Sequence, residues 1–403
     1  MGKIATIPDR GEKKRVVIIG GGFAGLQIAK KIDTKFYQVV LIDNFNYYHF
    51  QPLMYQVATA GLEPSSISYP LRKTFQKRKS FHVRTCEAYD VDSENKILRT
   101  SIGTISYDYL VIATGCDTNY FGNDKLQDTT FALKSVSEAI LMRNRILMSF
   151  EQALSTTNEE ELREILTFVI VGGGATGVEL AGALADMRKT ILPKDYPDID
   201  FSKMEIHLVD ASPRLLFAMS ENASEKASKT LKDRNVIIHQ DIPVNSYEDK
   251  IVEMGNGVKL RSRNVFWVGG IKANSLNGLN PDSYFRGRLS VDEYNRVVGY
   301  NNIFSLGDTC IMLSDNTPKG HPQVAQVAMQ MAKNLAHNLN NNAKEEKEFK
   351  KFVYDDRGSL ATIGRNAAVA DLGSFKFSGR VAWWLWLWVH ILSIVGMKNK
   401  VSV

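Results

Sequence analysis

The stretch RVVIIGGGFAGLQIAK, residues 15–30, decides the fold, because a near copy, TFVIVGGGATGVELAG, recurs at residues 167–182. In both copies an apolar run rich in β-branched residues predicts a buried parallel strand, and glycines follow it directly. The glycines fit the pattern Gly-x-Gly-x-x-Gly at Gly20, Gly22 and Gly25 and again at Gly172, Gly174 and Gly177. The first makes a tight turn, the second lets backbone approach a pyrophosphate, and the third lets a helix pack on the strand. Two such units predict two dinucleotide sites.

An acidic residue follows each copy where an adenine ribose would bind. Asp43 ends the next apolar run after the first copy, and Asp210 does so after the second. In this motif the pyrophosphate rests on a helix N-terminus and the acid hydrogen-bonds the ribose. Because no arginine follows either acid directly, we predict NAD rather than NADP, with Ser212 and Arg214 close enough to keep NADP open.

Length and composition indicate an ordered protein of two or three domains. The chain has 403 residues, of which 44% are hydrophobic and 23% charged. Its formal charge of +6 is too mild to predict a nucleic-acid partner, and it is compatible with an anionic membrane. The cysteines Cys86, Cys116 and Cys310 form no Cys-x-x-Cys or metal-ligand spacing, so we expect neither a disulfide, a redox dithiol nor a metal site. Without a secretory signal, the expected compartment is the cytoplasm.

Three further strand ends carry residues suited to a nucleotide cleft. The run at 104–113 leads into Thr114 and Gly115, and the run at 265–272 ends at Gly269 and Gly270. A Gly-Asp pair ends a third run, where Asp308 can hydrogen-bond a polyol chain or simply form a turn. Farther along, Gln326 and Gln330 are four residues apart and would share one face of a helix.

Glu179 lies two residues after the last glycine of the second copy. An acid in the first turns of a helix commonly serves the helix dipole. A catalytic or nicotinamide-contacting role is the second interpretation, and both stay open from the residues alone. The corresponding position of the first copy is Gln27.

Several segments predict local structure. Residues 135–155 and 158–166 have helical spacing, with Asn158 as a cap before three glutamates. Residues 65–80 are basic and predict one helix with a solvated face, or one attracted to anionic lipid. The aromatic segment 44–61 is either a buried, proline-bent loop or a wall beside a flavin or quinone. Residues 352–371 predict a strand pair with its turn at 355–358.

The segment VAWWLWLWVHILSIVGM, residues 381–397, has no Asp, Glu, Lys or Arg and contains four of the five tryptophans. A spanning helix needs about 20 apolar residues, so this segment is at the short extreme. Tryptophan prefers the headgroup region, and Arg380, Lys398 and Lys400 flank the segment. We predict docking in the membrane interface, with a buried core helix as the alternative.

Taken together, these residues resemble the type II NADH:quinone oxidoreductases, single-chain NADH dehydrogenases that do not pump protons. The motifs that carry the resemblance are GGGFAG (20–25), HFQPLMYQVATAG (49–61), ATGCDTNYFG (113–122), GGGATGVELAG (172–182), FSLGD (304–308), AQVAMQ (325–330) and the tail from Arg380. The resemblance implies an α/β fold with two Rossmann-like domains, for FAD and NADH, and a C-terminal membrane-associating region. The expected bounds are 14–130 and 289–340 for the FAD domain, 131–288 for the NADH domain and 341–403 for the C-terminal region.

The resemblance also implies roles for single residues. Those that would hold FAD are Gly20, Gly22, Phe23, Ala24, Gly25, Asp43, Asn44, Ala113, Thr114, Gly115, Asp308 and Ala325. Those that would hold NADH are Gly172, Gly174, Thr176, Gly177, Asp210, Gly269 and Gly270. Glu179, beside the nicotinamide, and Gln326, beside the isoalloxazine, would be the catalytic residues. Gln326 and Gln330 would contact the quinone.

The implied activity is transfer of a hydride from NADH to FAD and of two electrons to a membrane quinone, at the cytoplasmic face of the cell membrane. The absence of paired cysteines separates the chain from disulfide reductases and sulfide:quinone oxidoreductases. Two alternatives remain: an NADH-dependent flavoprotein reductase of a soluble protein acceptor, and an NADH-sensing flavoprotein. The sequence leaves open which quinone is used and whether the chain forms a homodimer.

Overall fold

The computed structural model describes residues 2–4, 6–345, 348–396 and 399–400, and it divides into two compact units. Unit 1 comprises Met1–Tyr48, Tyr69–Asp117 and Lys272–Asp355. Unit 2 comprises His49–Ser68, Thr118–Ile271 and Asp356–Val403. Four short strands lie where the chain passes from one unit to the other: β3 (Tyr47–His49), β4 (Ser68–Pro70), β10 (Cys116–Thr118) and β18 (Ile271–Ala273).

Unit 1 is built on a parallel five-stranded sheet in the order β21-β9-β1-β2-β5. Its strands are β1 (Lys14–Ile19), β2 (Tyr37–Asp43), β5 (Phe81–Thr85), β9 (Tyr109–Ile112) and β21 (Ile303–Ser305). The central strand β1 pairs with β2 from Lys14 opposite Tyr37 to Ile19 opposite Ile42, and β2 is buried from Tyr37 to Ile42. Such continuous apolar burial is expected for a parallel strand covered on both faces, and the strand order is that of a doubly wound dinucleotide fold.

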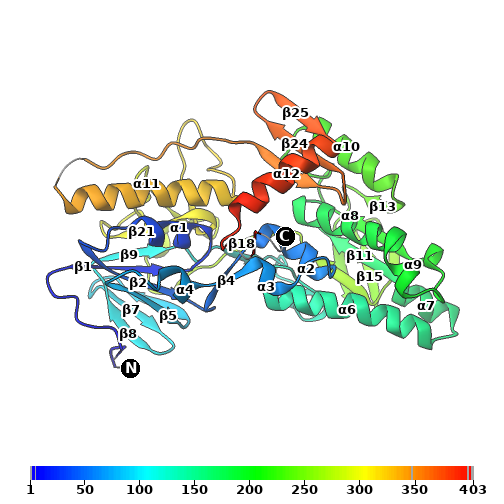
Figure 1. Ribbon diagram of the computed structural model, residues 1–403, viewed down its shortest axis with the longest axis horizontal. Coiled ribbons are helices and arrows are strands. Elements are labelled where there is room, and N and C mark those ends of the chain that lie inside the picture. Colours follow the sequence, from blue (N-terminus) through cyan, green and yellow to red (C-terminus); the bar gives the residue numbers. More distant parts are fainter. Residues whose placement is uncertain (1, 5, 346–347, 397–398, 401–403) are drawn as a thin grey trace. The chain divides into compact units, whose positions relative to one another are not determined.

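Helices α1 (Phe23–Lys31) and α11 (Ala325–Ala343) pack against each other in unit 1 (Figure 1). The Tyr37 hydroxyl donates to the Leu339 carbonyl at 2.6 Å and so ties α11 to the sheet. The smaller elements of unit 1 are α4 (Leu71–Phe75), β6 (Ala88–Asp92), β7 (Ile97–Thr100), β8 (Gly103–Ser106), η3 (Pro281–Ser283), β19 (Tyr284–Phe285), β20 (Arg288–Ser290), η4 (Gly307–Thr309) and β22 (Cys310–Ile311).

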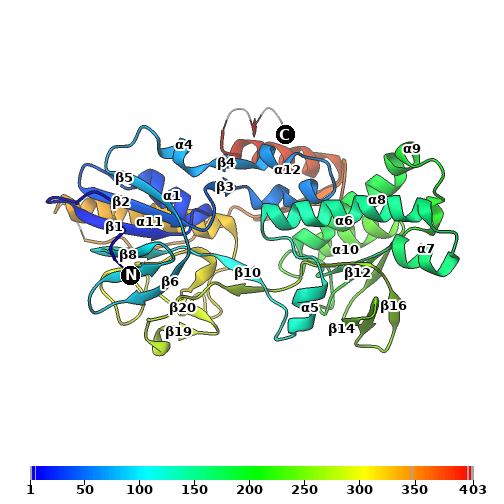
Figure 2. The same ribbon diagram turned by 90° about the horizontal axis from the view of Figure 1, so that it is seen from below.

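Unit 2 has a parallel four-stranded sheet in the order β13-β12-β11-β17, and three smaller antiparallel strands come between β13 and β17 in the chain. The sheet strands are β11 (Thr167–Val171), β12 (Glu205–Val209), β13 (Val236–His239) and β17 (Asn264–Trp267). The other elements before residue 272 are η1 (Gln51–Leu53), α2 (Met54–Ala58), α3 (Pro64–Ile67), α5 (Asp124–Thr129), α6 (Val136–Ser155), α7 (Glu159–Leu166), α8 (Ala175–Thr190), α9 (Leu192–Asp195), η2 (Phe201–Lys203), α10 (Glu221–Lys232), β14 (Val244–Glu248), β15 (Ile251–Met254) and β16 (Lys259–Arg261). Figure 2 shows α5 beside β14.

The predicted helices at 135–155 and 158–166 are confirmed by α6 and α7. Ser135 and Glu138 form a reciprocal capping box at the start of α6. The Asn158 side chain accepts from the backbone N–H groups of Glu160 and Glu161 at the start of α7, as its position before an acidic turn predicts.

The single helix predicted for residues 65–80 is wrong. The structure has two short helices, α3 and α4, separated by β4, in which Pro70 is extended with ψ 127°. Proline removes a backbone donor and disfavours a helical conformation in the residue before it, so the helix cannot run through. Of the basic residues, Arg78 donates to the carbonyls of Ala29 and Ile32, at the C-terminal end of α1.

The C-terminal hairpin also differs from prediction in the position of its turn. Strand β23 (Ser359–Thr362) pairs antiparallel with β24 (Ala368–Leu372), and β24 with β25 (Phe375–Ser378). The turn lies at 363–367, where Gly364 and Asn366 have φ +97° and +60°, and not at 355–358. Both residues tolerate the left-handed conformation that a tight turn requires.

Helix α12 (Arg380–Ser393) follows this hairpin in unit 2. It covers residues 381–393 of the aromatic segment predicted at 381–397, of which Met397 lies outside the described residues. Within the described part of the chain, no helix combines the length and apolar character needed to cross a membrane.

Candidate functional site

The first glycine motif forms a turn in which two glycines are required by packing and one faces open space. Gly20 has φ +95°, and a Cβ there would lie 2.2 Å from the Ala113 carbonyl oxygen. A Cβ at Gly25 would lie 1.7 Å from the Gly20 carbonyl oxygen, since α1 packs directly on the strand end. A Cβ at Gly22 would meet nothing within 4 Å. That is the pattern expected where backbone must approach a pyrophosphate.

The second motif repeats this geometry in unit 2. Gly172 has φ +117°, and a Cβ there would lie 2.5 Å from Gly269. A Cβ at Gly177 would lie 1.8 Å from the Gly172 carbonyl oxygen, whereas one at Gly174 would meet nothing within 4 Å. Both units therefore contain a turn shaped to accept a ligand at its middle glycine.

The helices that follow these turns begin without a side-chain cap. Gly22 precedes α1 and Gly174 precedes α8, and neither N-terminus is capped by a side chain. By contrast, α6, α7 and α10 each begin with a capping Ser or Asn side chain. The first N–H groups of a helix lack intrahelical partners, so an uncapped N-terminus favours an anion such as a pyrophosphate.

The two predicted ribose acids occupy equivalent positions. Asp43 is the last residue of β2, and one of its oxygens accepts the Phe45 N–H at 2.7 Å while the other accepts the Gly21 N–H. Asp210 directly follows β12, accepts the Ser212 N–H at 2.5 Å and accepts the Gly173 N–H. Burial raises the pKa of Asp43, and these backbone N–H groups partly offset that effect. Each acid is thus held beside the glycine turn of its own unit.

Unit 1 brings the predicted flavin residues at 113–115 together with the segment at 307–309. The Thr114 hydroxyl lies 3.1 Å from that of Thr309. It also donates to the Asn274 carbonyl at 2.7 Å, and the Asn274 side chain returns a bond to the Thr114 carbonyl at 3.1 Å. Asn274 was not identified from the sequence, because a single asparagine in a loop carries no pattern.

Asp308 lies in the same cluster. Its carboxylate accepts the Cys116 thiol at 3.1 Å, and its carbonyl accepts the Gln323 side chain at 3.0 Å. Gly307 has φ +71° and packs on Ala328 of α11, which brings the first turn of α11 beside Asp308. That turn carries Ala325 and Gln326, and it too begins without a side-chain cap. Predicted flavin residues from three distant segments, 113–115, 308 and 325–326, therefore adjoin within unit 1.

Gln330 is engaged with the backbone of unit 1. Its Nε2 donates to the Asp355 carbonyl at 2.8 Å, and its Oε1 accepts the Asp355 N–H at 2.9 Å. Both ends of the amide therefore hold the segment that follows α11, on the helix face that Gln330 was predicted to share with Gln326.

Glu179 is buried on α8, with 7% of its surface exposed. Burial raises its pKa to about 8, and the Thr362 N–H, which donates to it at 3.4 Å, lowers that pKa in part. A carboxyl in this range holds a proton at neutral pH and can exchange it close to working pH, unlike a solvated carboxylate that serves only the helix dipole.

The loop after Asp210 is fixed by two groups that the sequence did not identify as structural. Arg214 donates to the carbonyls of Leu216, Phe217 and Met219 within that loop. Asp371 of β24 accepts both the N–H and the hydroxyl of Ser220 at 2.7 and 2.8 Å. Arg214 is therefore committed to the loop backbone rather than extended toward a ribose phosphate.

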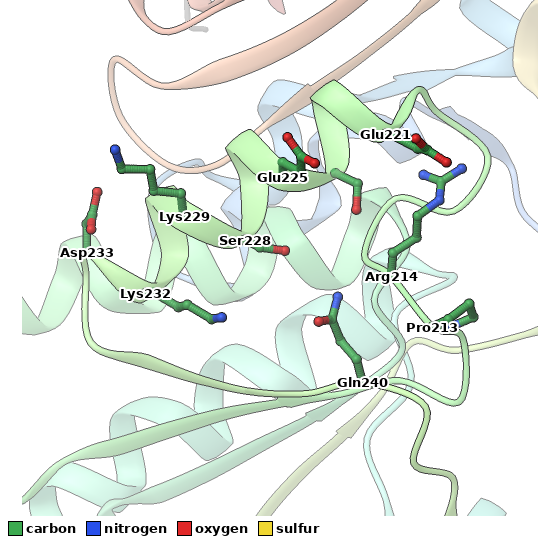
Figure 3. A pocket seen from close by; sticks show the side chains of 10 residues that line it. Pro213, Arg214, Glu221, Glu225, Ser228, Lys229, Lys232, Asp233 and Gln240 are labelled. Atoms are coloured by element: carbon green, nitrogen blue, oxygen red, sulfur yellow. The ribbon is translucent and has the colours of Figure 1, made fainter.

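A cavity of about 580 Å³ opens next to this loop, between α10 and the residue that follows β13, Gln240. Figure 3 shows Ser228 and Lys232 on α10 facing Gln240 across it. Its wall contains three basic residues, Arg214, Lys229 and Lys232, and three acidic ones, Glu221, Glu225 and Asp233. Because these charges balance, the wall has no net preference for an anion, and the cavity contains none of the predicted cofactor residues.

Helix α12 divides its tryptophans between two environments. Trp386 is 1% exposed and stacks on His390 with ring centroids 4.1 Å apart. Trp384 and Trp388 are 63% and 68% exposed, and Val381 and Leu392 on the same face are 67% and 55% exposed. Four large apolar side chains at this helical spacing form an outward-facing surface, which we call the tryptophan face.

None of the three cysteines forms a disulfide. Cys86 and Cys310 are buried, and burial raises the pKa of the Cys310 thiol to about 12, so neither is suited to thiolate chemistry. The described residues also contain no group of three or more His, Cys, Asp or Glu side chains that could hold a metal ion.

Comparison with known proteins agrees with this geometry. Residues 14–332 match the model of the pyridine nucleotide-disulphide oxidoreductase family, and residues 357–403 match that of the NDH2 C-terminal domain. The chain belongs to the pyridine nucleotide-disulphide oxidoreductase family and, by its similarity to the relatives described next, to the type II NADH:quinone oxidoreductases.

Individual relatives support this assignment. The chain is 32% identical to the type II NADH:quinone oxidoreductase Ndh of Mycobacterium tuberculosis over 408 residues, covering 97% of this chain and 86% of that protein. It is 29% identical to the type II NADH:quinone oxidoreductase of Staphylococcus aureus, covering 92% of each. Its fold matches that of NDH2 from Plasmodium falciparum, solved in complex with NADH, with a TM-score of 0.91 at 23% identity and coverage of 97% and 96%.

Proposed function

We propose that this protein is a non-proton-pumping NADH:quinone oxidoreductase in which unit 1 holds FAD and unit 2 receives NADH. The observation that carries the proposal is the pair of glycine turns, each with open space at its middle glycine and an uncapped helix behind it. FAD bound in unit 1 would accept a hydride from NADH and pass two electrons to a quinone, and the protein would supply binding, orientation and access.

In unit 1, Gly22 and the start of α1 would bind the FAD pyrophosphate, Asp43 its ribose and Asp308 its ribityl chain. Ala113, Thr114 and Gly115 would line the ring. The uncapped start of α11, with Ala325 and Gln326, would favour an electron-rich group, since a helix N-terminus carries partial positive charge. Gln326 would contact the quinone, and Gln330 would support it by holding the segment at Asp355.

In unit 2, Gly174 and the start of α8 would bind the NADH pyrophosphate, and Asp210 the adenine ribose. Glu179 would hold or release a proton close to neutral pH, because its burial keeps it protonated there. Replacement of Glu179 by Gln should therefore lower turnover while FAD stays bound. Unchanged kinetics would remove Glu179 from the catalytic residues.

The test of the activity is anaerobic reduction of the FAD-loaded protein by NADH, followed by addition of a soluble menaquinone or ubiquinone analogue. We expect bleaching of the flavin absorbance by NADH and its rapid return with the quinone. Reoxidation no faster than in buffer alone would contradict the quinone assignment and favour a soluble protein acceptor. A protein that binds NADH without flavin reduction would be a sensor.

We further propose that the tryptophan face docks on the membrane surface, at the cytoplasmic side. Tryptophan side chains partition into the headgroup region, and three cysteines that form no disulfide suit a reducing compartment. Substitution of Trp384 and Trp388 by Ser should lower binding to anionic liposomes about tenfold or more and leave flavin reduction by NADH unchanged.

The matched control is Phe217→Ser, which removes a 58% exposed aromatic elsewhere in unit 2. Equal loss of binding in the control would contradict the assignment, and oxidation of external NADH by inverted but not by right-side-out vesicles would support the cytoplasmic side.

A further inference from the structure

A hydrogen-bond chain within unit 2 leads to Glu179 from two distant parts of the sequence. The Tyr55 hydroxyl on α2 lies 3.1 Å from the Thr362 hydroxyl on β23, although 307 positions separate them in the chain. Gln56 Nε2 donates to the same Tyr55 oxygen at 2.9 Å. The Thr362 N–H in turn donates to Glu179 at 3.4 Å. Tyr55, Thr362 and Glu179 are all buried, with 6%, 1% and 7% exposed.

The Tyr55 hydroxyl is held by two side chains. It accepts a hydrogen from Gln56, and it shares a hydrogen bond with the Thr362 hydroxyl in which either oxygen can be the donor. In both arrangements the bond ties α2 to β23 at Thr362, and its removal would leave a buried hydroxyl without this partner, at a cost comparable to a lost hydrogen bond.

Glycine on α8 allows strand β23 to come this close. A Cβ at Gly182 would lie 2.5 Å from the Ile363 carbonyl carbon. Beyond Thr362, Arg234 donates to the Ile363 and Arg365 carbonyls, and it pairs with Asp186. The strand is thus anchored past Thr362 by ionic groups and at Thr362 by the Tyr55 hydroxyl.

We propose that Tyr55 is a positioning residue for the oxidoreductase reaction: its hydroxyl holds Thr362 so that the Thr362 N–H stays on the Glu179 carboxyl and sets how tightly that carboxyl holds a proton. An N–H donor stabilises the carboxylate and opposes the effect of burial. Without it, burial acts unopposed and Glu179 retains its proton to higher pH. Tyr55 interacts electrostatically with Glu179 and with Asp186, and Asp186 pairs with Arg234. The other charged or titratable groups on α8, and on β12 and α10 packed against it, are Arg188, Lys189, Glu205, His207, Glu221, Glu225, Lys226, Lys229 and Lys232. A Tyr55→Phe substitution removes none of them.

The test is a pH titration of the FAD-loaded Tyr55→Phe enzyme, which keeps the ring and removes the hydroxyl. Infrared difference spectra follow the carbonyl band of the protonated Glu179 carboxyl, assigned by its loss in Glu179→Gln. The hydrogen bond from the Thr362 N–H to Glu179 is long, at 3.4 Å, so its loss should have a modest effect. We expect the titration midpoint of Glu179 to rise by about 0.5 to 1 unit. The pH profile of kcat should shift by the same amount, and KM for NADH should be unchanged. A midpoint within about 0.2 units of the unmodified enzyme would overturn the proposal.

Three further variants separate positioning from general destabilisation. Thr362→Val removes the hydroxyl that bonds to Tyr55 and keeps the N–H, so it should reproduce the shift and serves if Tyr55→Phe fails to fold. Thr362→Ser keeps the hydroxyl and should leave the midpoint where it is in the unmodified enzyme. Tyr107→Phe in unit 1 is the matched control: Tyr107 is 2% exposed, and its hydroxyl has no hydrogen-bond partner in the part of the chain that the structure describes. An equal shift in this control would contradict the proposal. The catalytic consequence rests on the proposed function, so a moved infrared midpoint with an unchanged kcat profile would uphold the hydrogen-bond assignment and overturn the role of Glu179 in turnover.

Discussion

Replacement of Glu179 by Gln should make unit 2 less sensitive to alkaline pH. The folded-state pKa of Glu179 is raised by burial to about 8, against an ordinary value of 4.5. Between these values the folded chain keeps a proton that the unfolded chain has released. The contribution of this group to stability is therefore fully present below about pH 4.5 and is lost as the pH rises through about 8. A glutamine of nearly equal shape does not titrate, so it escapes this loss.

The size of the effect follows from the difference of about 3.5 units between the two pKa values. At about 1.4 kcal/mol per unit, this sets a ceiling of about 5 kcal/mol, of which about 4 kcal/mol falls between about pH 5 and about pH 9. In a unit of this size, 1 kcal/mol moves the melting temperature by about 2 to 4 °C. The melting temperature of Glu179→Gln, relative to that of the unmodified protein, should therefore rise by about 10 °C across this range.

Tryptophan fluorescence is the suitable probe, because all five tryptophans, Trp267 and four in α12, belong to unit 2. Thermal melts of the FAD-loaded proteins at about pH 5, 7 and 9 give the comparison. Glu225→Gln, which removes an exposed carboxyl from the same unit, is the control and should follow the unmodified protein at each pH. A Glu179→Gln difference that stays constant within about 2 °C from pH 5 to pH 9 would refute the reasoning.

Four further substitutions test single contacts. Gly22→Ala should fold but lose FAD, because its Cβ would enter space open to the ligand, and flavin absorbance after gel filtration measures the loss. Gly25→Ala should fail to fold, because its Cβ would lie 1.7 Å from a carbonyl oxygen. Full flavin content in Gly22→Ala would contradict the proposed pyrophosphate site at Gly22. Gly182→Ala should lower the stability of unit 2 by about 1 to 3 kcal/mol in urea melts, since it forces α8 and β23 apart, and unchanged stability would contradict the close approach. Asp371→Ala should raise KM for NADH about three- to tenfold at constant flavin content, because Ser220 and its loop lose two hydrogen bonds of about 1 kcal/mol each; an unchanged KM would dissociate this loop from nucleotide binding.

The sequence predicted the elements whose signals are local. The glycine turns, their parallel strands, the helices α6 and α7 and the Asn158 cap of α7 depend on residues within a few positions of one another, and all are found as predicted. Prediction failed where neighbouring residues favour different local structures. Residues 65–80 contain helix formers, but Pro70 outweighs them, and the hairpin turn followed Gly364 and Asn366 rather than the Asp-rich segment before β23.

Long-range pairing accounts for what could not be predicted. The contact between Tyr55 and Thr362 spans 307 positions, and the Asp371 bonds to Ser220 span 151. Neither Thr362 nor Asp371 belongs to a motif, and their residue types alone do not distinguish them from the other polar residues of a β-hairpin. Their importance appears only once β23 and β24 are seen beside α8 and α10.

The two glycine units share the same strand, turn and helix but are proposed to bind different nucleotides, and they differ at residues outside the shared glycines. Ten residues after its first glycine the second unit has Gly182, where the first has Lys30, which carries a long side chain. Gly182 lets β23 lie close against α8, and β23 brings the Thr362 N–H to Glu179. In the first unit the position of Glu179 is Gln27, which has no proton to exchange at neutral pH. Glu179 and Gly182, the glycine that lets β23 approach, thus occur three residues apart in the same copy. This is expected if the unit proposed to receive NADH must also control a proton.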